Sequence, residues 1–102
     1  MTLADADALV ARLPALAGIT ADSRRVAPRM AFAAYPGAQR DGRAFIDDAI
    51  ARGAAAVIYE PRDFTWVPQW ALPHVAVPEL RSSIGPIASA VHRHPSRALW
   101  MV

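Results

Sequence analysis

Apolar residues recur along this chain at helical spacing in three segments. Residues 2–13 carry leucine, valine and alanine on one stripe, which predicts an amphipathic helix. A second helix is expected to begin at Asp41, a good N-cap, and to end at Gly53, where a left-handed residue is favoured. Residues 79–92 predict a third helix, and the Gly85-Pro86 pair should kink it or delay its start.

Short apolar runs between these segments predict strands at residues 18–23, 31–35, 54–59 and 74–77. Residues 54–59 are apolar without alternation, which is typical of a strand buried on both faces. Strand, helix and strand joined by short connections form a βαβ unit with parallel strands. The pattern therefore predicts a small α/β domain whose short, mainly parallel sheet is packed by helices.

The composition agrees with one soluble domain and excludes several kinds of chemistry. The 102 residues are 54% hydrophobic and 20% charged, and no apolar run approaches the roughly 20 residues of a bilayer span. The N-terminus is acidic where a secretory signal is basic, so we expect a cytoplasmic protein that does not bind membranes. Cysteine and lysine are both absent, which excludes thiolate ligands, a Schiff base and a phosphate-loop lysine.

Two polar loops beside predicted strands carry the candidate chemistry. Asp22-Ser23-Arg24 offers a hydroxyl, backbone N–H groups and a guanidinium to phosphate oxygens. Its alternative is a turn in which Arg24 pairs with a carboxylate. Residues 37–42 lead into a helix N-terminus that suits an anion, or form a tight connection capped by Asp41. If the two loops meet at one edge of the sheet, they form a pocket for a small anion or a nucleotide.

Other polar groups give weaker signals. His92 and His94 would point to nearly opposite sides of a helix, so we expect no metal site. Asp47 and Asp48 are expected to face outward, without a paired-carboxylate site. The net charge is only +2 and the arginines are not interleaved with aromatic residues on a strand, so nucleic acid is not an expected partner.

An alternative function is a non-catalytic protein-interaction module. Trp66 and Trp70 could stack on a base or dock a partner, or they could pin the proline-rich loop to the domain. Residues 98–102 form an apolar run that starts like a buried strand and then stops. We expect this run to be the start of a second, truncated domain, because an open apolar strand edge invites aggregation.

A longer pattern runs from residue 18 to the end of the chain. It comprises Thr20-Ala21-Asp22-Ser23-Arg24, Pro28, Phe32-Ala33-Ala34, Gly37, Asp41-Gly42, Phe45-Ile46, Ala49, Gly53-Ala54 and Ala56-Val57. This pattern resembles the N-terminal domain of the Mur ligases, which add amino acids to the UDP-linked peptidoglycan precursor. Residues 94–102 resemble the run before the ATP-binding loop of the ligase that adds the third peptide residue.

The resemblance implies that residues 1–97 are a UDP-substrate-binding domain and residues 98–102 the start of the central ATP-binding domain. The substrate would be UDP-N-acetylmuramoyl-L-alanyl-D-glutamate, and the added residue usually meso-diaminopimelate. ATP and Mg²⁺ would act in the parent enzyme, where the central and C-terminal domains are this domain's partners; the fragment alone would be inactive and hold no cofactor. The D-alanyl-D-alanine-adding ligase has a similar N-terminal domain and is the alternative.

Matched motif to motif, the resemblance implies UDP contacts at Ala21, Ser23, Ala38, Gln39 and Arg40, supported by Arg24, Asp41 and Gly42. Ser23 would bind the diphosphate through its hydroxyl and N–H, and Gln39 and Arg40 would hold uracil or ribose. The two alanines could offer only backbone groups and apolar contact. Two departures from the family are Arg29-Met30, where Gly-Asp is usual, and Ala38, where a histidine is frequent.

Overall fold

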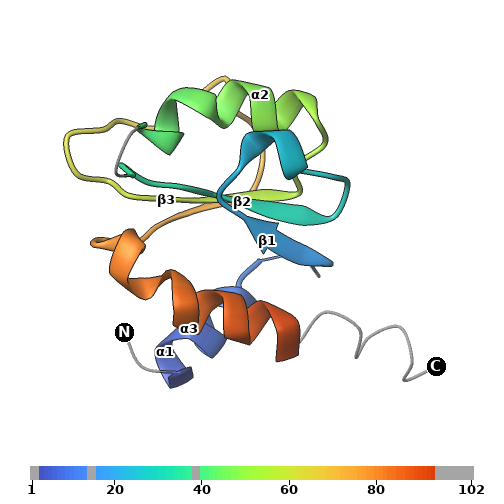
Figure 1. The fold of residues 1–102 in the computed structure, drawn as a ribbon, viewed down its shortest axis with the longest axis vertical. Coiled ribbons are helices and arrows are strands. Elements are labelled where there is room, and N and C mark those ends of the chain that lie inside the picture. The colour runs from blue at the N-terminus through green and yellow to red at the C-terminus, as the bar shows by residue number, and fades with distance from the viewer. Residues whose placement is uncertain (1–2, 14–15, 38–39, 94–102) are drawn as a thin grey trace.

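The computed structural model describes residues 3–13, 16–37 and 40–93. A four-stranded parallel sheet lies at its centre, with the strands in chain order: β1 (Gly18–Thr20), β2 (Met30–Ala34), β3 (Ala56–Tyr59) and β4 (His74–Ala76). The helices are α1 (Leu3–Ala11), α2 (Ile46–Ala51) and α3 (Leu80–Arg93), with 3-10 turns η1 (Ser23–Arg25) and η2 (Gly42–Phe45). Helices α1 and α3 cover one face of the sheet and α2 covers the other (Figure 1). The predicted fold class is therefore confirmed.

The two central strands are buried on both faces, as the unbroken apolar run predicts. Ala31 and Ile58 belong to the hydrophobic cluster on the α1 and α3 side. Phe32 and Val57, which are partners in the β2–β3 register, belong to the cluster on the α2 side. All four side chains are fully buried. The sheet thus holds both helical layers through alternate residues of the same strands.

The connection from β3 to β4 contains no helix, although parallel strands are usually joined by one. Four apolar residues of this loop pack against the cluster on the α2 side: Phe64, Trp66, Trp70 and Leu72. The indole N–H of Trp66 donates to the backbone carbonyl of Trp70 at 3.3 Å, and the indole N–H of Trp70 donates to the Asp47 carboxylate. Of the three roles considered for these tryptophans, the structure shows the pinning of the loop.

One helix start differs from the sequence-based expectation and another agrees with it. Asp41 caps the 3-10 turn η2, and the α-helix proper begins only at Ile46. The third helix begins at Leu80, next to the predicted residue 79, and continues through Pro86, so of the two effects considered for Gly85-Pro86 the delayed start is excluded. A carboxylate oxygen of Glu60 accepts a hydrogen bond from the Leu80 N–H at 3.2 Å and fixes this start from a distant part of the chain. Among the described residues no helix is long and apolar enough to cross a membrane.

Gly53, between α2 and β3, has a φ of 98° that side-chain-bearing residues rarely adopt. We expect Gly53→Ala to lower the free energy of unfolding by about 1–2 kcal/mol, because the left-handed conformation crowds a Cβ atom. Gly53→Asn should lower it less, since asparagine tolerates this region better. Urea denaturation measures both changes. Equal stability of wild type and Gly53→Ala would contradict the assigned backbone conformation.

Candidate functional site

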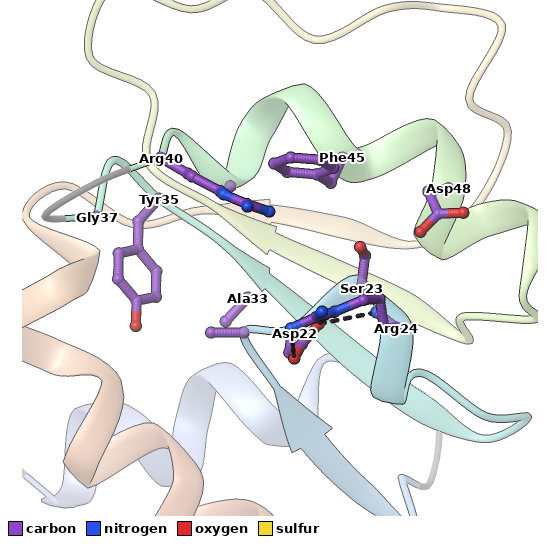
Figure 2. A pocket seen from close by; sticks show the side chains of 11 residues that line it. Asp22, Ser23, Arg24, Ala33, Tyr35, Gly37, Arg40, Phe45 and Asp48 are labelled. Atoms are coloured by element: carbon purple, nitrogen blue, oxygen red, sulfur yellow. Dashed lines mark hydrogen bonds and ion pairs between the residues drawn. The ribbon is translucent and has the colours of Figure 1, made fainter.

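The candidate site lies at the carboxyl edge of the sheet, between the segments that follow β1 and β2. In a parallel sheet the carboxyl ends of neighbouring strands meet at one edge, where ligands usually bind. A pocket of about 490 Å³ lies there. It is lined by Ala21, Asp22, Ser23, Arg24, Ala33, Tyr35, Gly37, Arg40, Gly42, Phe45 and Asp48 (Figure 2). The two polar loops singled out in the sequence therefore meet at one pocket.

The segment after β1 is ordered by Asp22. Its side chain accepts a hydrogen bond from the Arg24 backbone N–H at 3.0 Å, which caps η1. The same carboxylate binds the Arg24 guanidinium through Nε at 3.1 Å and Nη2 at 3.0 Å. This pairing, more than any other contact, lowers the pKa of Asp22. The structure thus shows the turn considered as the alternative, in which the Arg24 guanidinium is already paired.

The segment after β2 is a tight turn that uses its own backbone donors. The Gly37 N–H donates to the Arg40 carbonyl at 2.7 Å, and the Gly42 N–H donates to the Tyr35 carbonyl at 2.9 Å. A Cβ atom on Gly42 would lie 3.1 Å from that carbonyl oxygen, so a larger residue would force the turn apart. Asp41 also forms an isolated antiparallel bridge with Pro36.

The N-terminus of η2 does not offer the free donors that an anion site needs. The Asp41 carboxylate accepts from the Arg43 N–H at 2.9 Å, and the Asp41 carbonyl accepts from the Ala44 N–H at 3.1 Å. The Gly42 N–H is also paired, as described above. Of the two alternatives considered for this segment, the structure shows the connection capped by Asp41.

Charge in the pocket is balanced except at Arg40. Asp48 pairs with Arg52 at 3.1 Å and its side chain is 43% exposed, so it faces solvent as expected, although it also borders the pocket. Arg24 is paired with Asp22 at 3.0 Å. Among the described residues no ion pair is found for Arg40, whose side chain extends into the pocket (Figure 2). Arg40 therefore contributes an uncompensated positive charge to the pocket.

Five of the eight residues expected at the site line the pocket: Ala21, Ser23, Arg24, Arg40 and Gly42. Asp41 does not line it but shapes the turn, and Ala38 and Gln39 lie outside the described residues. Four pocket residues were not anticipated: Ala33, Tyr35, Phe45 and Asp48. The position of Tyr35 just after a strand was a usable signal, since it puts this side chain at the carboxyl edge. The described residues contain no cluster of three histidine, aspartate or glutamate side chains that could hold a metal ion.

The chain is similar to known proteins over most of its length. The model of the Mur ligase family, catalytic domain, matches residues 15–92. The UDP-N-acetylmuramoyl-L-alanyl-D-glutamate–2,6-diaminopimelate ligase of Janthinobacterium sp. (strain Marseille) is 45% identical over 96 residues, 94% of this chain and 19% of that protein. The UDP-N-acetylmuramyl-tripeptide synthetase of Roseiflexus sp. (strain RS-1) is 43% identical over 89 residues, 87% of this chain and 17% of that protein. The chain spans about a fifth of the length of these relatives.

A solved structure supports the fold. The MurF ligase from Thermotoga maritima in complex with ADP aligns with a TM-score of 0.57 and 26% identity, covering 69% of this chain and 15% of that chain. Fold and pocket together define a small α/β domain with a ligand-sized opening at the carboxyl edge of a parallel sheet. The chain belongs to the Mur ligase family, and the resemblance to its N-terminal domain is confirmed.

The ion pair of Asp41 predicts a pH-dependent stability. Hydrogen bonds from Arg43 are the main cause that lowers the pKa of Asp41 below its ordinary value of 3.8. The pair therefore stabilises the folded state above that value and ceases to do so as the pH falls below it. We expect Asp41→Asn to cost roughly 1 kcal/mol at pH 7, allowing for solvent screening, and less at pH 3. Urea denaturation at both pH values measures this, with Glu79→Gln as a control at an exposed carboxylate. A cost that does not change with pH would contradict the pairing.

Proposed function

We propose that this domain binds the UDP moiety of UDP-N-acetylmuramoyl-L-alanyl-D-glutamate for a cytoplasmic, ATP-dependent ligase that adds the third peptide residue in peptidoglycan synthesis. The names of the relatives support this substrate and this step, and 2,6-diaminopimelate is the added residue that most of them name. We propose its meso form as the residue that is added. These relatives are 41–46% identical to the chain, whereas the MurF ligase is 26% identical. The higher identity favours the third-residue ligase over its sister enzyme.

The observation that carries the proposal is the meeting of Ser23 and Arg40 in one pocket. A diphosphate needs hydrogen-bond donors and positive charge, and guanidinium groups suit phosphate oxygens. The resemblance implied uracil or ribose as the contact of Arg40, but its guanidinium lies in the pocket without an ion-pair partner among the described residues. We therefore assign the diphosphate to Arg40 as well as to the Ser23 hydroxyl. Gln39 is proposed to hold uracil or ribose, while Ala21 and Ala38 contribute backbone and apolar contacts.

The remaining chemistry is assigned to other parts of a longer protein. We propose that residues 1–97 form the substrate-binding domain and that residues 98–102 begin the central domain. Mg²⁺ has no fitting ligand cluster among the described residues, and the chain has no lysine for a phosphate loop. We propose that ATP and Mg²⁺ act in the partner domains and that this domain binds one end of the substrate.

UDP alone should bind weakly but measurably. The molecule has about 25 heavy atoms, and at ~0.3 kcal/mol per atom the upper limit of its affinity is ~7.5 kcal/mol, a Kd of a few micromolar. Titrating the 102-residue chain with UDP should shift the amide resonances of Ser23 and Arg40 at ligand concentrations below ~1 mM. Unchanged resonances at that concentration would contradict the proposal. The chain alone should release no ADP from ATP in the same samples.

A specific contact between Arg40 and the diphosphate can be distinguished from the effect of positive charge near the pocket. We expect Arg40→Gln to weaken UDP binding about tenfold, about 1.4 kcal/mol, and to leave uridine binding nearly unchanged, because only UDP carries the diphosphate. Arg25→Gln is the matched control, since Arg25 is near the pocket, exposed and not part of its lining. Calorimetric titration of each variant with UDP and with uridine measures the effect. Equal losses in the two arginine variants would show that Arg40 makes no specific contact.

A further inference from the structure

Arg43 is held unlike the other ion-paired arginines of the described residues. Its side chain is only 10% exposed, whereas the other three are 45–80% exposed. It binds the Asp41 carboxylate through Nε at 3.0 Å and Nη2 at 2.8 Å. Arg43 does not line the pocket, although Arg40, which precedes Asp41, does. A charged side chain buried to this extent needs a full set of partners.

The other partners of Arg43 come from the segment that follows β3. Its Nη1 donates to the Glu60 carbonyl at 3.0 Å and also to the Arg62 carbonyl. The Phe64 ring centre lies 5.2 Å from the guanidinium carbon, within the range of a cation–π contact. One guanidinium therefore joins the turn after β2 to the loop after β3.

The segment that receives these bonds is itself fixed. Glu60 is 8% exposed, and its backbone N–H donates to the Ala34 carbonyl of β2 at 2.9 Å. Its carboxylate accepts from the N–H of Leu80, at the start of α3, and from that of Arg62. The segment that binds Arg43 is thus connected to β2 and to α3, which covers the face of the sheet opposite to α2.

We propose that Arg43 is a positioning residue for the pocket. By binding Asp41 on one side and two backbone carbonyls on the other, it holds Arg40 where this side chain faces Ser23. A planar guanidinium can serve both sides at once, whereas a lysine ammonium cannot reproduce the paired bonds. This inference rests on the proposed function, because it takes a diphosphate to be the ligand of the pocket.

The first experiment compares Arg43→Gln and Arg43→Lys with Arg12→Gln, a charge-matched control at an exposed position outside the pocket. We expect that in Arg43→Gln only about a tenth of the molecules keep the turn in the conformation that binds UDP. The Kd for UDP then rises about tenfold. Arg43→Lys keeps the charge but not the paired bonds, so it should lose nearly as much affinity. Arg12→Gln should change the Kd less than twofold. A wild-type Kd in folded Arg43→Gln would overturn the inference.

A double-mutant cycle distinguishes positioning from a general loss of structure. If Arg43 acts through Arg40, Arg43→Gln reduces the ratio of UDP to uridine affinity in the wild type but not in the Arg40→Gln background. An equal reduction in both backgrounds would overturn the inference. Should Arg43→Gln fail to fold, Asp41→Asn replaces it, since asparagine keeps an oxygen for the cap but loses the charge pair.

The outcome for Arg43 can be separated from that for UDP binding. A wild-type chain that binds no UDP would refute the proposed function alone. Ligand-free amide spectra then decide the role of Arg43: its replacement by Gln should shift the resonances of Gly37 and Arg40 far more than those of α1. Unchanged resonances at Gly37 and Arg40 would overturn the inference without any ligand.

Discussion

Parallel pairing of β1, β2 and β3 brings together segments that are about twenty residues apart in the chain. Thr20 pairs with Phe32 in the register of β1 and β2, and Phe32 pairs with Val57 in that of β2 and β3. Because these strands run in the same direction, the segments that follow them emerge at one edge. The pocket, the turn that carries Arg40 and the anchor of Arg43 all depend on this pairing. The two buried clusters maintain it from both faces of the sheet.

The same short motif, Asp-X-Arg, follows two of these strands and has different consequences. In Asp22-Ser23-Arg24 and in Asp41-Gly42-Arg43 the aspartate caps a 3-10 turn and binds the guanidinium two residues later. Arg24 ends in solvent, with a side chain that is 75% exposed, whereas Arg43 is enclosed by the β3–β4 loop. Local sequence therefore determines the turn, and the neighbouring segment determines whether it becomes an anchor.

Much of the fold could be predicted because its signals are local. The periodicity of the first helix, the apolar run of β3 and the left-handed Gly53 depend only on nearby residues. The range of α3 could be predicted, but the hydrogen bond that fixes its start could not, since the acceptor is Glu60, twenty residues earlier. Similarly, Ser23 and Arg40 were expected at the site, but the place of Asp48 at the border of the pocket depends on how α2 packs. Ion pairing determines which arginine of the pocket is free to bind a ligand. The spacing of residues in the sequence carries no information on that pairing.

The helix-free connection between β3 and β4 has a consequence for how the domain opens. It is held by ring packing among Phe64, Trp66 and Trp70 and by side-chain hydrogen bonds from Arg43 and Trp70, with no repeating backbone ladder to support it. β4 is an edge strand that follows this loop directly. Loop and strand should therefore detach as one cooperative unit, at a lower free energy than the rest of the sheet. Hydrogen exchange in this half of the domain would then proceed by subglobal opening, while β2 remains protected until the whole domain unfolds.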